Sequence, residues 1–124
     1  MSYYDRVNIE ELIGKTLTEI NNLGDELIFT VEGGDQYKMY HSQDCCESVG
    51  IEDINGDLND LIGSPILKAE EVSNENDPEG FDSSNYESYT WTFYHLATIK
   101  GYVTIRWFGY SNGYYGEGVD FEKI

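Results

Sequence analysis

Two neighbouring segments, 88–99 and 102–109, most constrain what this chain can fold into. Both are rich in β-branched and aromatic residues, which favour strands. Lys100-Gly101 between them is typical of a two-residue hairpin turn. The stretch 88–121 also holds 11 of the 18 aromatic residues and Arg106, one of only two arginines. The sequence therefore predicts a long antiparallel hairpin that carries most of the rings.

Strand alternation divides the side chains of this hairpin between two sheet faces. A turn at Lys100-Gly101 pairs Ile99 with Tyr102 and places His95 opposite Arg106. One face then carries Trp91, Phe93, His95, Arg106, Phe108 and Tyr110. The other face carries Thr92, Tyr94, Leu96, Val103, Ile105 and Trp107. We expect the second face to form the core because it holds the branched aliphatic residues. A different turn would change the cross-strand partners but not this division.

The rest of the chain is predicted to complete a single domain, 1–124, of mostly antiparallel strands. Apolar runs bounded by turn residues predict further strands at 16–21, 26–32, 36–41, 48–54, 65–72 and 119–122. Short helices are expected at 9–13, capped by Asn8, and at 57–62. The polar, turn-rich composition of 73–87 predicts a long acidic exposed loop. The expected fold class is α+β, mostly antiparallel β, as a twisted sheet or a small sandwich or partial barrel.

The formal net charge of −17 limits the partners of this chain. Such a charge repels nucleic-acid backbones and anionic membranes, so we expect neither direct nucleic-acid binding nor membrane association. Residues 44–87 contain 13 acidic residues against one base, Lys68. This stretch is interpreted either as a solvated rim or as a surface complementary to a basic partner. Residues 1–11 lack the basic and apolar regions of a signal peptide, so the cytosol is the expected compartment.

The segment His41-Ser42-Gln43-Asp44-Cys45-Cys46-Glu47 concentrates side chains that can bind or react. A structural role, ligand contact through His41, Asp44 and Glu47, and metal binding or Cys–His catalysis are the alternatives. The paired ligand spacing of structural zinc is missing, and 53–57 departs from a calcium-binding loop, so we predict no metal site. No nucleophile elbow or phosphate-binding glycine loop is present, so we expect neither an enzyme nor a cofactor. The adjacent cysteines are expected to be reduced, because neighbouring side chains on a strand point to opposite faces.

The face that carries Arg106 is the main candidate for ligand binding. Its guanidinium and imidazole among aromatic rings suit a planar ring with an attached phosphate. In the following loop, the Asn112-Gly113 pair favours positive φ, and Tyr114 and Tyr115 can close over a ligand. The alternative is that this face packs on a second sheet or a partner subunit, with Arg106 paired to an acidic side chain.

Four motifs resemble a family of small phage and prophage proteins that is mostly catalogued as a domain of unknown function. They are His41-x-Gln43-Asp44-Cys45-Cys46-Glu47-Ser48-Val49, Glu52-Asp53-Ile54-x-Gly56-Asp57-Leu58, Thr90-Trp91-Thr92-Phe93-Tyr94 and Ser111-Asn112-Gly113-Tyr114-Tyr115. The resemblance covers about 13–121, with Gly116 where the family is expected to have a serine. It implies a phage gene expressed in the host cytoplasm. Small non-enzymatic phage proteins of this kind often counter host defence.

Two functions from different classes follow as expectations. The first is a homo-oligomeric sponge that sequesters a nucleotide-derived immune signal, similar in role to Thoeris anti-defence sponges. Its ligand-binding residues are expected to be Trp91, Phe93, His95, Arg106, Phe108, Asn112, Tyr114 and Tyr115. The second is an acidic inhibitor of the anti-CRISPR type, which presents 44–87 to a basic host protein such as a defence nuclease.

Overall fold

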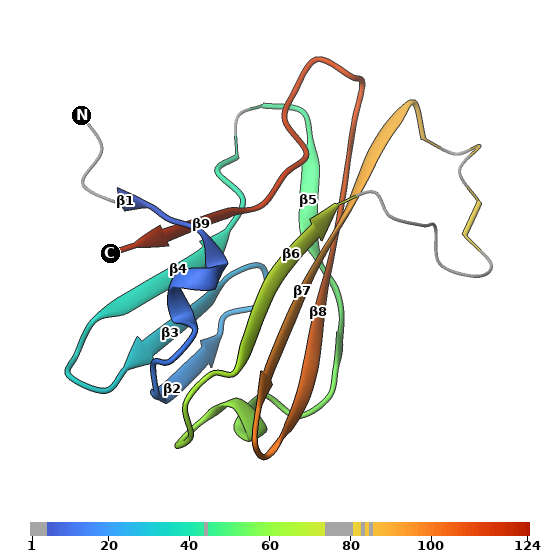
Figure 1. The fold of residues 1–124 in the computed structure, drawn as a ribbon. Helices are drawn as coiled ribbons and strands as arrows, with labels where there is room; N and C mark the ends of the chain where they lie inside the picture. Colours follow the sequence, from blue (N-terminus) through green and yellow to red (C-terminus); the bar gives the residue numbers. More distant parts are fainter. Residues whose placement is uncertain (1–4, 44, 74–80, 83, 85) are drawn as a thin grey trace.

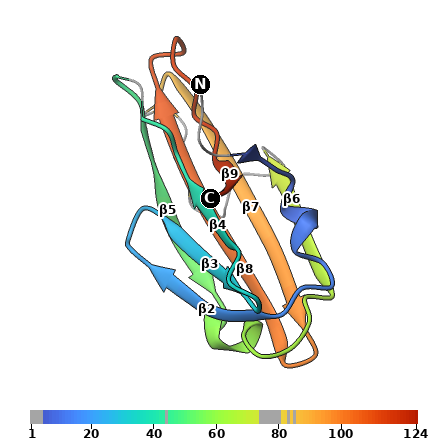
Figure 2. The same ribbon diagram turned by 90° about the vertical axis from the view of Figure 1, so that its left-hand side faces the viewer.

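A computed structural model describes residues 5–43, 45–73, 81–82, 84 and 86–124 of this chain. Its strands form two sheets that lie face to face, as Figures 1 and 2 show. The first sheet has the order β1 (Asp5–Arg6), β9 (Asp120–Lys123), β4 (Gln36–Tyr40), β3 (Leu27–Val31) and β2 (Leu17–Asn22). The second has the order β5 (Ser48–Asn55), β8 (Gly101–Ser111), β7 (Ser88–Thr98) and β6 (Lys68–Ser73).

This architecture confirms the predicted mostly antiparallel β fold, because every pair of neighbouring strands in both sheets is antiparallel. The two predicted helices are single 3₁₀ turns, η1 (Ile9–Leu12) and η2 (Leu58–Leu61). Asn8 and Asp57 cap them by accepting backbone N–H bonds through their side chains. The sequence prediction missed β1, which is only two residues long and pairs with β9. Among the described residues, no helix is long and apolar enough to cross a membrane.

The core lies between the two sheets and is built on the face of the β7–β8 hairpin that the sequence assigned to it. Tyr94, Leu96, Val103, Ile105 and Trp107 are fully buried there. The first sheet contributes to the core Leu17, Leu27, Phe29, Tyr37, Met39 and Phe121, among others. One direct link between the sheets is a hydrogen bond from the Trp107 indole N–H to the Met39 sulfur, at 3.3 Å. Burial of these large side chains is the main favourable contribution to folding.

The hairpin register differs from the predicted one by two residues. Thr98 pairs with Gly101, so the turn is Ile99-Lys100, and His95 faces Thr104 while Phe93 faces Arg106. The reason lies in η2: the Thr98 hydroxyl donates to the Asp60 carbonyl and accepts from the Lys100 N–H. A Cβ at Gly101 would lie 2.7 Å from the Asp60 side chain, so the glycine serves this close approach and not the turn. A shift of two residues preserves the alternation, so the division into two faces is confirmed.

Three tyrosines of the fold have pKa values raised by burial and by a neighbouring carboxylate. Burial and a hydrogen bond to Glu122 raise the pKa of Tyr40 from 10.0 to about 12, and burial and Glu11 raise that of Tyr37 to about 12. Burial also raises the pKa of Tyr94, whose hydroxyl donates to Glu71. Each shift favours the neutral phenol in the folded protein.

We predict that the protein loses stability as the pH rises through the window from 10.0 to about 12. The contribution of a raised tyrosine pKa is complete below the unfolded value and lost above the folded one. Tyr40→Phe is expected to cost about 1 kcal/mol at neutral pH, through one lost hydrogen bond. Its stability should then fall less steeply across the alkaline window. Urea denaturation at a series of pH values measures both slopes, and equal slopes would contradict the assignment to Tyr40.

Candidate functional site

The outward side chains of β7 and β8 form a ladder of packed rings, which we call the aromatic face. It consists of Tyr89, Trp91, Phe93, His95, Tyr102, Arg106, Phe108 and Tyr110. The ring centroids of Trp91 and Phe108 lie 4.5 Å apart, and those of Phe93 and His95 lie 6.2 Å apart in parallel planes. Tyr102 and Tyr110, at its two ends, are 49% and 42% exposed. The structure therefore brings together five predicted site residues on one sheet surface: Trp91, Phe93, His95, Arg106 and Phe108.

Part of this face is covered by residues from the segment predicted as an exposed loop. Phe81 lies 5.2 Å from Trp91 and 5.4 Å from Phe108, between ring centroids. Tyr86 lies 5.1 Å from Phe108 and 5.0 Å from Tyr110. Both rings are half-buried, while residues 74–80 of the segment lie outside the described part of the chain. The more open part of the aromatic face is the end that carries Phe93, His95 and Tyr102.

Arg106 already has a partner within the chain. Its Nε donates to the Glu52 carboxylate, and its guanidinium carbon lies 5.4 Å from the centre of the Trp91 ring. Glu52 lies at a β-bulge between Ile51 and Asp53 in β5, and a bulge of this kind re-aims side chains. The side chains of Arg106 and Glu52 are 27% and 42% exposed, so the pair lies at the surface. Arg106 is thus paired with an acidic side chain, which is one part of the alternative interpretation of this face.

The other polar groups at the open end of the face also have internal contacts. His95 Nδ1 lies 3.1 Å from the Thr104 hydroxyl. Lys68 Nζ lies 3.4 Å from a Glu70 carboxylate oxygen and 5.5 Å from the centre of the Tyr102 ring. Lys68, like Arg106, therefore has both a carboxylate and a ring beside it. On this face, two of the chain's own cations lie beside rings and are balanced by carboxylates.

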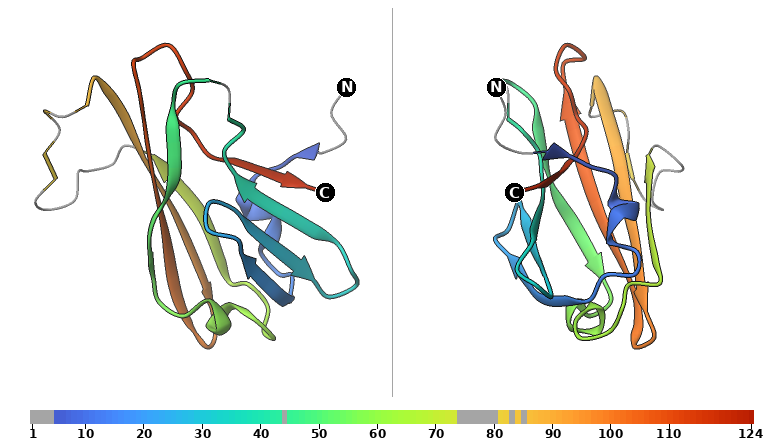
Figure 3. Two further views of the ribbon diagram at one scale, coloured as in Figure 1. Left: turned by 180° about the vertical axis from the view of Figure 1, so that it is seen from behind. Right: turned by 60° about the vertical axis from the view of Figure 1, so that its left-hand side comes forward.

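Two loops that carry the other candidate residues meet at one end of the sandwich, as Figures 1 and 3 show. They are the β4–β5 connection, 41–47, and the β8–β9 loop, 112–119, and we call their contact the loop junction. His41 joins them: its Nδ1 donates to the Gly118 carbonyl at 2.7 Å, and its Nε2 lies 2.7 Å from Glu47 Oε2. The side chains of His41 and Glu47 are only 8% and 1% exposed. A buried pair of this kind holds the two loops together.

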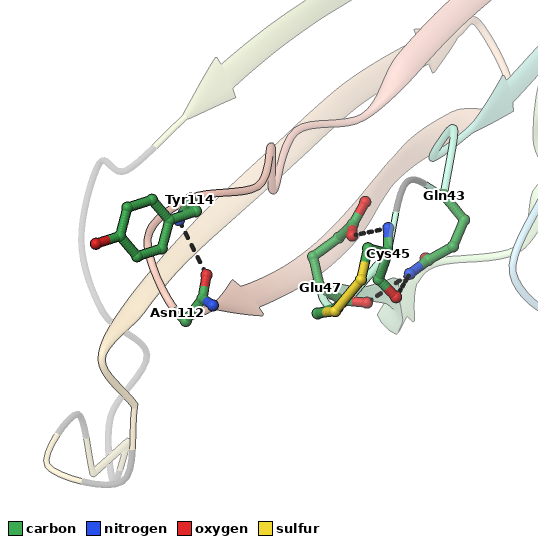
Figure 4. The surroundings of a disulfide bond; sticks show 6 residues. Gln43, Cys45, Glu47, Asn112 and Tyr114 are labelled. Carbon is green, nitrogen blue, oxygen red and sulfur yellow. Dashed lines mark hydrogen bonds between the residues drawn. A yellow bond between two sulfur atoms is a disulfide. The ribbon is translucent and has the colours of Figure 1, made fainter.

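The expectation that Cys45 and Cys46 are reduced is wrong for this structure, in which they form a disulfide. The expectation rested on strand alternation, but both residues lie in a bend between β4 and β5 and are exposed to solvent. Figure 4 shows their surroundings: the Cys45 N–H donates to Glu47 Oε1 at 2.9 Å, and the Gln43 amide donates to the Glu47 carbonyl at 2.7 Å. Asp44, also a predicted candidate, lies outside the described residues.

The residues predicted to cover a ligand lie in the β8–β9 loop, beyond the end of the strand that carries Arg106. Tyr114 is 88% exposed, and its N–H donates to the Asn112 side chain at 3.0 Å. Asn112 borders a shallow hollow of about 450 Å³ together with Tyr110, Tyr86 and Cys46. The structure thus separates the predicted residues into two groups, the aromatic face and the loop junction, with Tyr110 where they approach each other.

Two carboxylates that order these regions were missing from the predicted site. Glu117 is buried and accepts hydrogen bonds from the hydroxyls of Thr90 and Ser111. Gly109 permits this arrangement, because a Cβ there would lie 2.5 Å from the Glu117 carbonyl oxygen. Glu52 is the second. Glu52 pairs with Arg106, 54 residues away, and Glu117 accepts from Thr90, 27 residues away, so the local sequence does not reveal either contact.

The fold and these two regions define a small antiparallel β-sandwich protein with a ring-covered outer surface. The chain belongs to the family described as Domain of unknown function (DUF7448), which matches residues 10–121. This confirms the resemblance to a family of unknown function over nearly the whole chain. No curated protein and no solved structure matches this chain.

We predict that the buried His41–Glu47 pair stabilises the protein far more than an exposed ion pair does. His41→Ala and Glu47→Ala should each lower the free energy of unfolding by about 3 kcal/mol, because each leaves a buried polar partner. The double variant should cost clearly less than the sum of the two. Denaturant unfolding of the four proteins gives the coupling energy.

Arg6→Ala is the matched control, because Arg6 pairs with Asp120 but its side chain is 72% exposed. It should cost less than about 1 kcal/mol. Two results would show that the pair does not hold the loops together. In one, the effects of His41→Ala and Glu47→Ala on the free energy of unfolding are strictly additive; in the other, each effect is no larger than that of Arg6→Ala.

Proposed function

We propose that this chain is a non-enzymatic binding protein whose aromatic face holds a cationic segment of another protein. The observation that carries this proposal is the pairing of Arg106 with Glu52. The only arginine on the face is matched by a carboxylate, so the face does not offer an unmatched guanidinium to an anionic ligand. Its exposed rings and carboxylates instead suit lysine or arginine side chains.

The charge of the whole chain favours the same class of partner. A net charge of −17 attracts a basic protein over long range and slows the approach of an anion. Glu52, Asp53 and Glu87 are exposed around the face, and Glu70 is partly exposed beside His95. These carboxylates attract a basic segment to the aromatic face. They also offset the free-energy cost of removing water from its lysine or arginine side chains.

The chain's own cations illustrate the contact that we propose. Arg106 beside Trp91 and Lys68 near Tyr102 each combine a ring with a carboxylate. A cation from a partner can make the same contacts on the exposed surfaces of Tyr102 and Phe93. Rings supply contact area with little loss of side-chain freedom, and tyrosine is therefore enriched where binding energy concentrates.

The biological setting of this proposal comes from the sequence resemblance. It suggests a phage protein in the host cytoplasm that counters defence by blocking a basic, nucleic-acid-binding host protein, such as a nuclease. The nucleotide sponge, with its homo-oligomer, stays a prediction. In that function a phosphate has to bind an arginine whose charge Glu52 already balances, and Tyr114 has to leave its exposed position, so the geometry gives it less support.

We predict that Tyr102→Ala weakens binding of a synthetic peptide of alternating arginine and glycine by about three- to tenfold, the range expected for one cation–π contact. Tyr114→Ala, which removes an 88% exposed ring from the β8–β9 loop, is the control and should bind like the unchanged protein. Isothermal titration calorimetry at low ionic strength measures the three affinities. Equal effects of the two substitutions, or no binding to the unchanged protein, would count against the aromatic face.

Salt provides an independent prediction for the same complex. The affinity for the peptide should fall steeply as the ionic strength rises from about 0.01 to 0.15 M, over which the Debye length shrinks from about 30 to 8 Å. Glu52→Gln and Glu70→Gln should each reduce this salt dependence, because each removes a carboxylate that lies beside the aromatic face. An affinity that is insensitive to salt would contradict the electrostatic part of the proposal.

A further inference from the structure

The disulfide between Cys45 and Cys46 constrains the backbone of the β4–β5 connection. Because the two cysteines are adjacent, their bond closes an eight-membered ring that contains the peptide bond between them. The backbone torsions on either side of that peptide bond therefore cannot change independently while the ring is closed. Breaking the sulfur–sulfur bond opens the ring, and the backbone torsions can then change independently.

The disulfide is also accessible to reagents. Both Cys45 and Cys46 are exposed, and Cys46 borders the hollow next to Tyr110 and Asn112. A thiolate must reach one of the sulfur atoms for exchange to occur, so exposure decides whether a disulfide can react.

A chain of contacts leads from this ring to the β8–β9 loop. The Cys45 N–H donates to Glu47 Oε1 at 2.9 Å, and the other oxygen of this carboxylate lies 2.7 Å from His41 Nε2. The opposite side of the imidazole, Nδ1, donates to the Gly118 carbonyl at 2.7 Å. The Cys45 amide, which adjoins the ring, thus helps to fix the orientation of the carboxylate that holds His41 against Gly118.

We propose that Cys45–Cys46 is a thiol–disulfide exchange site for low-molecular-weight thiols, and that its reduction loosens the β8–β9 loop. One thiolate attacks a sulfur of the pair, forming a mixed disulfide and releasing the other cysteine as a thiolate, which takes up a proton. A second thiol then resolves the mixed disulfide. Two small thiols become one small disulfide, and the protein gains two electrons and two protons as two cysteine thiols. This site is separate from the cation-binding function of the aromatic face and does not depend on it.

The first experiment determines the state of the cysteines in the protein purified without reductant. The protein is denatured in excess iodoacetamide, and its intact mass is measured before and after incubation with dithiothreitol. We expect no alkylation before reduction and two alkyl groups afterwards. Two alkyl groups before reduction would mean that the cysteines are free, and would overturn the proposal.

The second experiment tests the coupling by amide hydrogen exchange on the folded protein, with and without dithiothreitol. Residues 112–118 should exchange about tenfold faster after reduction, as expected when one hydrogen bond that orders the loop is lost. The turn at Gly33-Gly34 lies outside the loop junction and should not change. The double variant Cys45→Ser with Cys46→Ser cannot form the ring, so it should exchange like the reduced protein and not respond to dithiothreitol.

Two outcomes of this experiment would overturn the coupling. In one, reduction is complete by mass but exchange of 112–118 is unchanged. In the other, dithiothreitol accelerates exchange equally in the unchanged protein and in the double serine variant, which would show that the effect does not pass through the disulfide.

Discussion

The antiparallel pairing of β7 (Ser88–Thr98) with β8 (Gly101–Ser111) is the constraint on which the rest of this structure depends. It assigns each side chain of the hairpin to one of two faces, and the inward face supplies the fully buried rings of Trp107 and Tyr94. Strands β5 and β6 pair along its two sides and inherit the same alternation. The position of Arg106 next to Trp91 on the outward face is therefore a consequence of how the core is packed.

Most of the fold could be predicted because it follows from periodicity, which is local. The hairpin turn was predicted incorrectly, but the division of its side chains into two faces was correct, because a register shift of two residues leaves the alternation intact. The turn itself could not be predicted, because it depends on the Asp60 carbonyl, which reaches Thr98 from η2. Strand β1 was not predicted because it has only two residues, and two residues are too few to show a periodic pattern.

The candidate site was less predictable, because its decisive contacts are long-range. Glu52 is 54 residues from Arg106 in the chain, and it reaches the guanidinium through a bulge that has no clear sequence signal. His41 and Glu47 were both candidates, but their role in holding Gly118 appears only when the loops meet. The cysteine pair was misjudged because alternation was applied to a bend. Residue type therefore identified the regions, and tertiary contacts decided what each residue does.

Our central proposal is that an incoming cation, and not a phosphate, binds the aromatic face, because Glu52 already pairs with Arg106. The NMR resonance of the Arg106 Nε–H tests this most directly, because that proton donates to Glu52. The account predicts a single, protected resonance that stays in place when a cyclic dinucleotide is added and moves in Glu52→Gln. If the dinucleotide shifts this resonance and Glu52→Gln leaves it unchanged, the result would contradict the account. It would favour the alternative function, sequestration of a nucleotide-derived signal.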